Sequence, residues 1–285
     1  MTTIIDGKLI SQKIRNELKE KTILLKDKPG LAVVLVGNDP GSQIYINGKI
    51  KVCAEIGFYS EKIELKETVS EKEIFEILAR LNSDKKIHGI LVQFPLPKNL
   101  QHLEEKIINF INPEKDVDCF HPANIGKLFT AKNSYKNLMI PCTPKGIIRL
   151  LKEYKIEISG KKVVICGRSN LVGKPLSLLF LLEGATVTIC HSLTKDLSFE
   201  TITGDIVVTA IGKKGFFSEK YFKEGAVVID VGINREDKKI YGDVDFKNVS
   251  DKVSAITPVP GGVGPMTIAM LMENVYQAYL NQADK

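Results

Sequence analysis

The sequence lacks the residue patterns that build a metal site or a disulfide framework. Its five cysteines are odd in number, widely spaced and without a C-x-x-C pair. The four histidines show neither i,i+4 pairing nor flanking cysteines, which a zinc site would require. We therefore expect no metal, and we expect reduced thiols in a cytoplasmic protein.

Long hydrophobic runs are also missing. The longest apolar run, residues 176–182, is interrupted by Ser177 and is too short to cross a bilayer. The first ten residues show no basic region followed by an apolar core, as a signal peptide would. These absences predict a soluble chain without a membrane segment.

Blocks of like charge are absent as well. Forty basic and thirty-four acidic residues give a formal charge of +6, and the lysines are scattered through 285 residues. So small an excess indicates attraction for anionic ligands more than a nucleic-acid footprint. No nucleic-acid partner is expected, although a basic binding module is kept as an alternative.

Strand and helix patterns alternate through the first 120 residues at the spacing of βαβ units. The run LAVVLV is typical of a strand buried on both faces. We expect strands at 31–36, 63–65 and 87–94, and helices at 8–25, 43–56 and 71–81. Residues 1–120 are thus predicted to form one parallel α/β domain.

A second alternation follows an irregular, proline-bounded stretch at 112–122. We expect strands at 163–166, 186–190, 205–210, 226–231 and 253–256, and helices at 141–155, 174–183 and 266–280. Residues 141–265 are predicted to form a Rossmann-type dinucleotide-binding domain. The last helix, within 266–285, is expected to pack back on the first domain, leaving a cleft between two α/β lobes.

The stretch KKVVICGRSNLVGKP at 161–175 reads as a strand, a glycine turn and a helix. Such a turn directs backbone N–H groups and a helix dipole at one point, which suits a phosphate, so Gly167 is a candidate cofactor-binding residue. Ser169 replaces the second glycine of the usual G-x-G-x-x-G fingerprint, and the next glycine is Gly173. An ordinary strand-to-helix turn is the alternative.

The next expected strand ends in Cys190, His191 and Ser192. Enzymes specific for NAD usually place Asp or Glu there to bind the ribose 2′-hydroxyl. The carboxylate is missing, whereas Arg168 and Ser192 suit a 2′-phosphate. NADP is therefore favoured over NAD, unless Arg168 only pairs with a surface carboxylate.

Tyr45 and Lys49 are four residues apart on the expected helix 43–56, hence on one face, just past the carboxyl end of a strand. Lysine acts as a base at neutral pH only where its ammonium form is disfavoured. A surface lysine beside a half-buried tyrosine is the alternative. Short-chain dehydrogenases share this spacing, but there the pair follows the nucleotide-binding glycines.

Three further features are candidates for ligand binding. Gln93 ends a buried strand and is placed to hydrogen-bond Lys49. Asp116 and Asp118 share a face if the backbone is extended, and one carboxylate there suits the two donors of an aminopyrimidine; an Asx turn or helix cap is the alternative. The loop PVPGGVGP at 258–265 combines stiffness with little side chain, which favours close approach to a ligand.

Together these segments resemble the bifunctional methylenetetrahydrofolate dehydrogenase/cyclohydrolase family. The motifs fall in the family's order and cover nearly the whole chain. They are YINGK at 45–49, VQFPLP at 92–97, KDVD at 115–118, PCTPKG at 141–146, GRSNLVGKP at 167–175, CHS at 190–192, DVGINR at 230–235, GDVDF at 242–246 and TPVPGGVGPMT at 257–267.

The resemblance implies a homodimer that oxidises 5,10-methylenetetrahydrofolate with NADP+ and hydrolyses the product to 10-formyltetrahydrofolate, a step of one-carbon metabolism that serves purine biosynthesis. Folate would lie in the cleft, with Tyr45 stacked on it, Lys49 as the catalytic lysine, Gln93 orienting that lysine and Asp118 holding the pterin edge. The folate pocket would be lined by Pro260 and Gly261. The dinucleotide contacts would come from Arg168, Ser169, Ser192 and the backbones of Gly212 and Ile233.

Two positions depart from the family pattern, because Phe94 replaces the more usual Leu and Cys119 replaces the usual Gly. If position 119 requires a positive φ, the cysteine costs about 1–2 kcal/mol and shifts Asp118. Two alternatives to this enzyme stay open: another NADP dehydrogenase of the shikimate type, and a catalytically silent folate or nucleotide binder.

Overall fold

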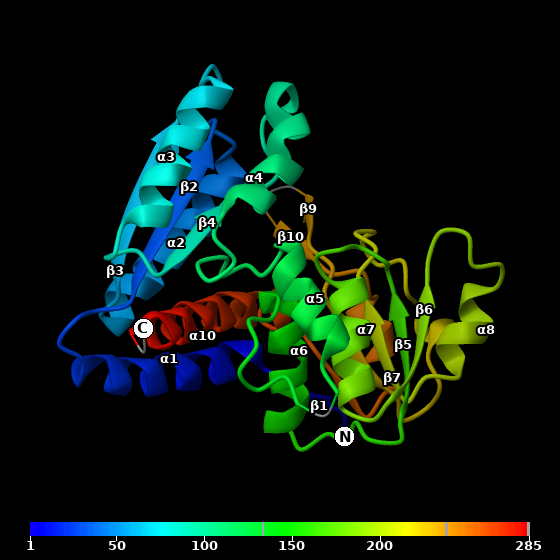
Figure 1. Ribbon diagram of the computed structural model, residues 1–285. Coiled ribbons are helices and arrows are strands. Elements are labelled where there is room, and N and C mark those ends of the chain that lie inside the picture. Colours follow the sequence, from blue (N-terminus) through cyan, green and yellow to red (C-terminus); the bar gives the residue numbers. More distant parts are fainter. Residues whose placement is uncertain (133, 237–238, 284–285) are drawn as a thin grey trace. The chain divides into compact units, whose positions relative to one another are not determined.

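A computed structural model describes residues 1–132, 134–236 and 239–283, which form two compact units (Figure 1). The six-stranded unit comprises Met1–Gln12, Leu128–Lys136 and Pro141–Thr267. The three-stranded unit comprises Lys13–Lys127, Asn137–Ile140 and the chain from Ile268 onward. Both main sheets are parallel, so the predicted α/β class is confirmed.

The sheet of the three-stranded unit has the order β3-β2-β4. Its strands are β2 (Gly30–Val36), β3 (Tyr59–Leu65) and β4 (Gly89–Val92), with α2 (Pro40–Ile56) after β2 and α3 (Glu71–Ser83) after β3. The apolar run of β2 is buried along its whole length, as predicted for a central strand. The carboxyl ends of the three strands therefore meet at one edge.

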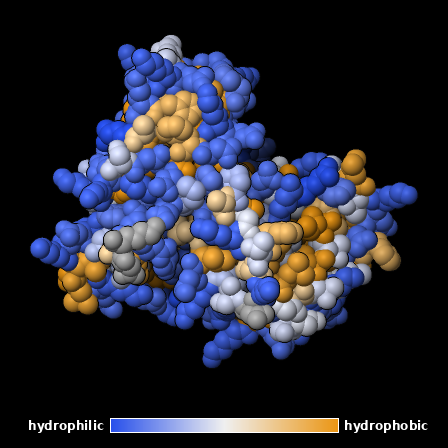
Figure 2. Space-filling view, in the orientation of Figure 1, coloured by the Kyte–Doolittle hydropathy of each residue, from blue (hydrophilic) through white to orange (hydrophobic). Residues whose placement is uncertain are grey.

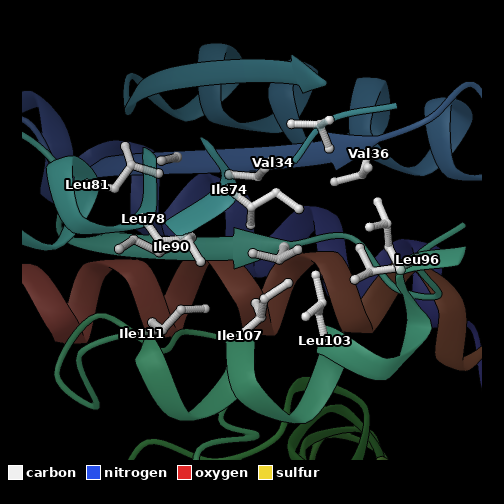
Figure 3. Close-up of a cluster of buried hydrophobic side chains, with 14 of the residues drawn as sticks. Val34, Val36, Ile74, Leu78, Leu81, Ile90, Leu96, Leu103, Ile107 and Ile111 are labelled. Carbon is white, nitrogen blue, oxygen red and sulfur yellow. The ribbon is translucent and has the colours of Figure 1, made fainter. Parts of the chain in front are cut away.

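One hydrophobic cluster of this unit lies between the sheet and two helices, α3 and α4 (Glu104–Phe110), the second preceded by the short η1 (Lys98–Leu103). Figure 3 shows Ile74, Leu78 and Ile107 directed from these helices toward β2 and β4. The apolar residues of α3 recur at helical spacing, and Ser70 caps its first turn. Burying each such side chain stabilises the fold by about 1.5–3 kcal/mol.

The other unit contains six parallel strands in the order β1-β11-β8-β7-β5-β6. The adjacent strands β8, β7, β5 and β6 have a Rossmann-type arrangement, in which a helical segment connects each parallel strand to the next. The strands are β1 (Thr3–Ile4), β5 (Lys162–Cys166), β6 (Thr186–Cys190), β7 (Ile206–Thr209), β8 (Val227–Asp230) and β11 (Ala255–Ile256). The helices and small elements are α6 (Cys142–Glu153), α7 (Gly173–Leu182), α8 (Leu197–Ile202), η2 (Glu219–Tyr221), α9 (Phe246–Val249) and the hairpin of β9 (Asn234–Glu236) and β10 (Lys239–Tyr241).

Three helices carry the chain from one unit to the other: α1 (Gly7–Ile23), α5 (Pro122–Thr130) and α10 (Val263–Ala283). Asp6 caps α1, because its Oδ1 accepts the N–H of Leu9 at 3.0 Å. The start of α1 packs so closely on the loop before α10 that a Cβ on Gly7 would lie 1.8 Å from the carbonyl oxygen of Gly262.

The structure differs from the sequence-based expectation in its short elements. The two-residue strand β1 was not predicted, and its parallel pairing with β11 places residues 1–12 in the six-stranded unit instead of with the rest of the first 120 residues. Nor were the short helices α4, α5, α8 and α9 predicted, because segments of this length carry too little periodicity.

Figure 2 shows hydrophilic residues over most of the visible face.

Candidate functional site

The side chains of Lys49 and Gln93 meet at the carboxyl edge of the three-stranded sheet. Gln93 directly follows β4, and Lys49 lies on α2, which follows β2. The Nζ of Lys49 donates a hydrogen bond to the Oε1 of Gln93 at 3.0 Å, as expected from the sequence. The Nε2 of Gln93 donates to the carbonyl of Phe94 at 2.8 Å, and this fixes the amide with its oxygen toward the lysine.

Asp118 brings a carboxyl group to the same cluster. Desolvation raises the pKa of this carboxyl from 3.8 to about 6, the positive charge of Lys49 opposes the shift, and the negative charge of Asp116 adds to it. Burial therefore disfavours the charged form of this carboxyl, and the positive charge of Lys49 favours it. A carboxyl, an amide and an amine gathered at one strand edge can hold a polar ligand and move a proton.

Asp116 has a different place from its neighbour. It is buried, and its carboxylate accepts the N–H groups of Cys119, Phe120 and His121 and the side-chain amide of Asn124. This is the turn-forming alternative considered for the Asp116/Asp118 pair. Asp116 therefore shapes the loop after it, and Asp118 is the carboxyl of the pair that interacts with Lys49.

The loop that carries Asp118 contains a residue with a left-handed backbone. Cys119 has φ of +62°, so the position does adopt the conformation that favours glycine. Its buried thiol lies near the carbonyls of Asp116 and Val117, and the amide of Asn274 donates to the carbonyls of Val117 and Ile140. These contacts hold the strained turn.

Tyr45 lies one helical turn before Lys49 on α2 and is half-buried.

In the six-stranded unit, the turn between β5 and α7 leaves no room for side chains at its two glycines. Gly167 has φ of +133°, and a Cβ there would lie 2.4 Å from the carbonyl oxygen of Ala210. A Cβ on Gly173 would lie 2.1 Å from the carbonyl oxygen of Gly167. Both glycines are therefore required for the backbone of β5 to turn directly into α7, and Arg168 and Ser169 are exposed on this turn.

The remaining cofactor candidates follow three other strands of the same sheet. Ser192 comes just after β6, Gly212 after β7 and Ile233 after β8. Because these strands are parallel, the residues share the carboxyl edge with the β5–α7 turn. Ser192 and Ile233 are exposed there, and Gly212 has φ of +67°. Ligands of open parallel sheets bind at this edge, so the arrangement suits a dinucleotide.

Two buried aspartates that sequence reasoning gave no role hold this edge together. Asp243 accepts the N–H groups of Ile211, Gly212 and Lys213 at 2.7, 3.1 and 2.8 Å. Asp230, at the end of β8, accepts the N–H groups of Gly232, Asp243 and Val244. Both aspartates stand in motifs that the resemblance used, DVGINR and GDVDF, and a carboxylate at a strand end is the signal that could have marked them. Because the N–H of Gly212 is engaged, its carbonyl is the backbone group left for a ligand.

Pro260 and Gly261 lie on the loop between β11 and α10, in the six-stranded unit. Pro260 is exposed, whereas Gly261 is buried with φ of +114° and its carbonyl accepts the N–H of Lys8 at 3.0 Å. The loop is thus anchored to the start of α1.

The described residues offer neither a metal site nor a membrane-spanning helix. They contain no group of three or more His, Cys, Asp or Glu side chains placed to hold a metal ion. No helix formed by these residues is long and apolar enough to cross a membrane. All five cysteines are free and buried.

Comparison with known proteins assigns both parts of the chain. Residues 5–118 match the model of the tetrahydrofolate dehydrogenase/cyclohydrolase catalytic domain, and residues 141–283 match the NAD(P)-binding domain of the same family. The bifunctional protein FolD of Sulfurihydrogenibium sp. is 54% identical over 281 residues, which are 97% of each chain.

Two solved structures are similar over almost the full length. The bifunctional enzyme FolD of Campylobacter jejuni is 47% identical, with a TM-score of 0.94 and 99% of both chains covered. The FolD of Trypanosoma brucei, complexed with NADP cofactor and an inhibitor, is 35% identical, with a TM-score of 0.93 and with 100% of this chain and 99% of that chain covered. The sites at the two sheet edges therefore stand on a shared framework, and the chain belongs to the tetrahydrofolate dehydrogenase/cyclohydrolase family.

Proposed function

We propose that this chain oxidises 5,10-methylenetetrahydrofolate to the 5,10-methenyl cation with NADP+ and then hydrolyses the cation to 10-formyltetrahydrofolate. The observation that carries the proposal is the cluster of Lys49, Gln93 and Asp118, in which an oriented amine faces a carboxyl at a strand edge. Membership in a dehydrogenase/cyclohydrolase family supports both reactions.

The six-stranded unit fits NADP. The turn at Gly167 and Gly173 excludes side chains and exposes Arg168 and Ser169, so the pyrophosphate can approach the backbone at the start of α7. No carboxylate stands at the end of β6 to bind a 2′-hydroxyl, whereas the guanidinium of Arg168 and the hydroxyl of Ser192 suit a 2′-phosphate. When bound, the nicotinamide ring supplies the hydride acceptor.

The proposal assigns folate contacts to four residues. The ionised carboxyl of Asp118 pairs with the two donors of the aminopyrimidine edge, and binding such donors favours the charged form that desolvation disfavours in the free protein. Tyr45 offers its ring for stacking one helical turn from Lys49. Pro260 and Gly261 present backbone with little side chain to the ligand.

The oxidation requires alignment and no acid or base from the protein. The lone pairs of the folate nitrogens stabilise the cation as the hydride leaves, so the chain contributes by holding the reacting carbon in position. Lys49 and Gln93 act here as positioning groups, because their mutual hydrogen bond fixes both side chains.

The hydrolysis does require proton transfer. Water attacks the methenyl carbon and loses a proton, and the ring nitrogen that leaves this carbon gains one. The hydroxyl of the intermediate releases its own proton to solvent as the formyl carbonyl forms. Lys49 is the group placed to accept the first proton and to return the second, since the nearby substrate cation disfavours a second positive charge on its amine. Gln93 orients the Nζ through the 3.0 Å hydrogen bond.

A spectrophotometric assay with methylenetetrahydrofolate, run in parallel with NADP+ and NAD+, tests the proposal. We expect reduced cofactor to form with NADP+. The methenyl absorbance should rise and then fall, because hydrolysis consumes the methenyl cation. Binding of folate and NADP without turnover would leave a silent binder as the better description. Equal use of NAD+ would overturn the roles given to Arg168 and Ser192.

We further infer a homodimer in the cytoplasm. Support for the dimer comes from β3, whose outer edge has no paired strand among the described residues, and an unpaired edge is a template for a second chain. Five free thiols suit a reducing compartment. Light scattering of the purified chain tests the dimer, and a monomer mass at micromolar concentration would refute it.

A further inference from the structure

A cavity of about 980 Å³ opens at the amino-terminal edge of the three-stranded sheet. This edge is the one opposite Lys49 and Gln93, because the cavity is lined by Tyr59 at the start of β3 and by His88 just before β4. Other walls come from the segment after α1, the turn after α3 and the last turns of α10, whose end lies near the start of β3 in Figure 1.

The lining is strongly basic. It holds five lysines, Lys26, Lys28, Lys85, Lys86 and Lys115, against a single aspartate, Asp27. The whole chain has a formal excess of only six positive charges, so one cavity concentrates most of that excess. Such a concentration of one sign attracts anions into the cavity.

Two of these lysines stabilise helix ends. The Nζ of Lys28 donates to the carbonyl of Thr22 in the last turn of α1 and to that of Leu25 just after the helix, at 2.7 and 2.8 Å. The Nζ of Lys115 donates to the carbonyl of Leu81 in the last turn of α3 and to that of Asp84 just after the helix, at 3.1 and 2.7 Å. Lysines at carboxyl ends of helices are common for this reason, so this pair alone would not indicate a ligand.

The other three lysines do not stabilise a helix end. Among the described residues, the ammonium groups of Lys26, Lys85 and Lys86 have no hydrogen-bond or ion-pair partner. All three side chains are exposed at the rim of one cavity. The positive charges of these lysines repel each other. A multiply charged anion bound between them would offset this repulsion, because it attracts all three.

His88 adds a directed donor. Its Nδ1 accepts the N–H of Gly30 at 3.0 Å, and burial, reinforced by the charge of Lys115, lowers the pKa of its ring. The neutral ring therefore carries its proton on Nε2, which is free to donate. The ring packs edge-on against Tyr279 at 5.0 Å, so aromatic surface lies beside the donors.

We propose that this cavity is a second ligand site, distinct from the catalytic edge, for an organic polyphosphate such as a nucleoside triphosphate. The phosphates would be held by Lys26, Lys85 and Lys86, with the organic part against Tyr59 and Tyr279. The volume favours such a ligand over a lone phosphate ion, because pockets for organic ligands span about 300–1,000 Å³.

Calorimetric titration of the full chain saturated with NADP+ tests the site, since the bound dinucleotide blocks phosphate binding at the β5–α7 turn. The probes are ATP and inorganic tripolyphosphate. We expect saturable one-to-one binding of ATP and weaker binding of tripolyphosphate. In the variant K26Q/K85Q/K86Q, the affinity for ATP should fall at least about tenfold, which corresponds to about 1.4 kcal/mol.

The matched control is K19Q/K51Q/K247Q, which removes the same charge at three exposed lysines that do not line the cavity. Its affinity for ATP should change less than about threefold, because only the screened long-range field is lost. Equal loss in both variants, or no saturable binding of ATP to the native chain, overturns the site. If tripolyphosphate binds as tightly as ATP, the assignment to an organic ligand is wrong.

Discussion

The carboxylate of Asp230 accepts the backbone N–H of Asp243 at 3.0 Å, and the carboxylate of Asp243 accepts the N–H groups of residues 211–213. One buried carboxylate thus fixes a second, and the second fixes the loop after β7. Burial raises the pKa of Asp230 to about 6, opposed by three backbone hydrogen bonds. The two groups set the shape of the edge where we place the dinucleotide.

Replacing Asp243 with Asn should loosen this loop. The amide keeps the shape of the carboxylate but brings N–H donors against backbone N–H groups, which leaves buried donors unpaired at about 1–3 kcal/mol. We expect KM for NADP+ to rise about tenfold or more and kcat to change less. The control is D251N, an equal charge change at an exposed aspartate of the same unit. If D243N matches D251N in steady-state kinetics, the loop does not depend on this carboxylate.

Lys49→Ala should separate the two activities. Loss of a group that relays protons typically costs about 10²–10⁴-fold, so the hydrolysis should fall by at least two orders of magnitude. The oxidation depends on alignment alone and should fall less. Full cyclohydrolase activity in this variant would exclude Lys49 as the proton carrier, and K51Q on the same helix provides the control.

Gln93→Leu should act through the lysine. It removes the acceptor that orients the Nζ, so we expect hydrolysis to slow about tenfold or more while folate still binds. Gln93→Glu keeps an acceptor and adds a charge that stabilises the ammonium form, which should shift the rate profile of hydrolysis to higher pH. A pH profile unchanged in both variants would contradict a positioning role.

Asp118 should make stability depend on pH. Its pKa is raised to about 6 from 3.8, so between these values the folded chain binds more protons than the unfolded chain. The free energy of unfolding therefore falls as pH rises from about 4 to 6. Asp118→Asn should be more stable than the native chain at pH 7.5, by about 1–3 kcal/mol, and equal to it near pH 4.

Urea denaturation at a series of pH values measures this difference. Asp116→Asn serves for contrast, because its carboxylate accepts four hydrogen bonds and the amide should destabilise the chain at every pH. A stability gain for Asp118→Asn that does not vary with pH would show that desolvation of the charge is not its cause.

Cys119 offers a test of backbone strain. At φ of +62°, Cys119→Gly relieves strain that Cys119→Ala retains, and both lose the buried thiol. The glycine variant should therefore be the more stable of the two by about 1 kcal/mol. At Cys53, buried inside α2, the order should reverse because glycine disfavours a helix interior. Thermal unfolding of the four variants measures their order of stability. The same order at both sites would show that backbone strain at Cys119 is not the cause.

Gly173→Ala should disrupt the dinucleotide edge. Its Cβ would lie 2.1 Å from the carbonyl oxygen of Gly167, so either β5 or α7 must move. We expect a loss of several kcal/mol in stability or of NADP binding outright. Gly126→Ala is the control, since a Cβ there meets nothing within 4 Å in α5 and should stabilise the helix by about 0.5–1 kcal/mol.

Much of the fold follows from local pattern. The apolar run of β2 and the spacing of Ile74 and Leu78 on α3 are strong enough to predict these elements from the sequence. The two-residue β1 is held by its partner β11, and the alternation of its own residues could not reveal a contact with a segment 250 positions away. Short elements are stabilised by tertiary pairing, so the local sequence pattern does not predict them.

The candidate site divides in the same way. The pair Lys49 and Gln93 could be predicted because both follow strands of one parallel sheet, and the structure joins them. The scaffold of Asp230 and Asp243 was missed, because the groups that these carboxylates bind are backbone N–H groups, and a carboxylate at a strand end is the one signal in the sequence. The positive φ at Cys119 was foreseen only through comparison with the glycine that usually stands there.

The order of segments along the chain also governs how the protein can be made. The strand β1 pairs with β11, which is synthesised about 250 residues later, and the three-stranded unit gains its α10 residues later still. Neither unit can finish folding before α10 has been synthesised, because both units contain residues of this helix. The two units therefore complete their folding together, and a chain cut before α10 would leave both of them incomplete.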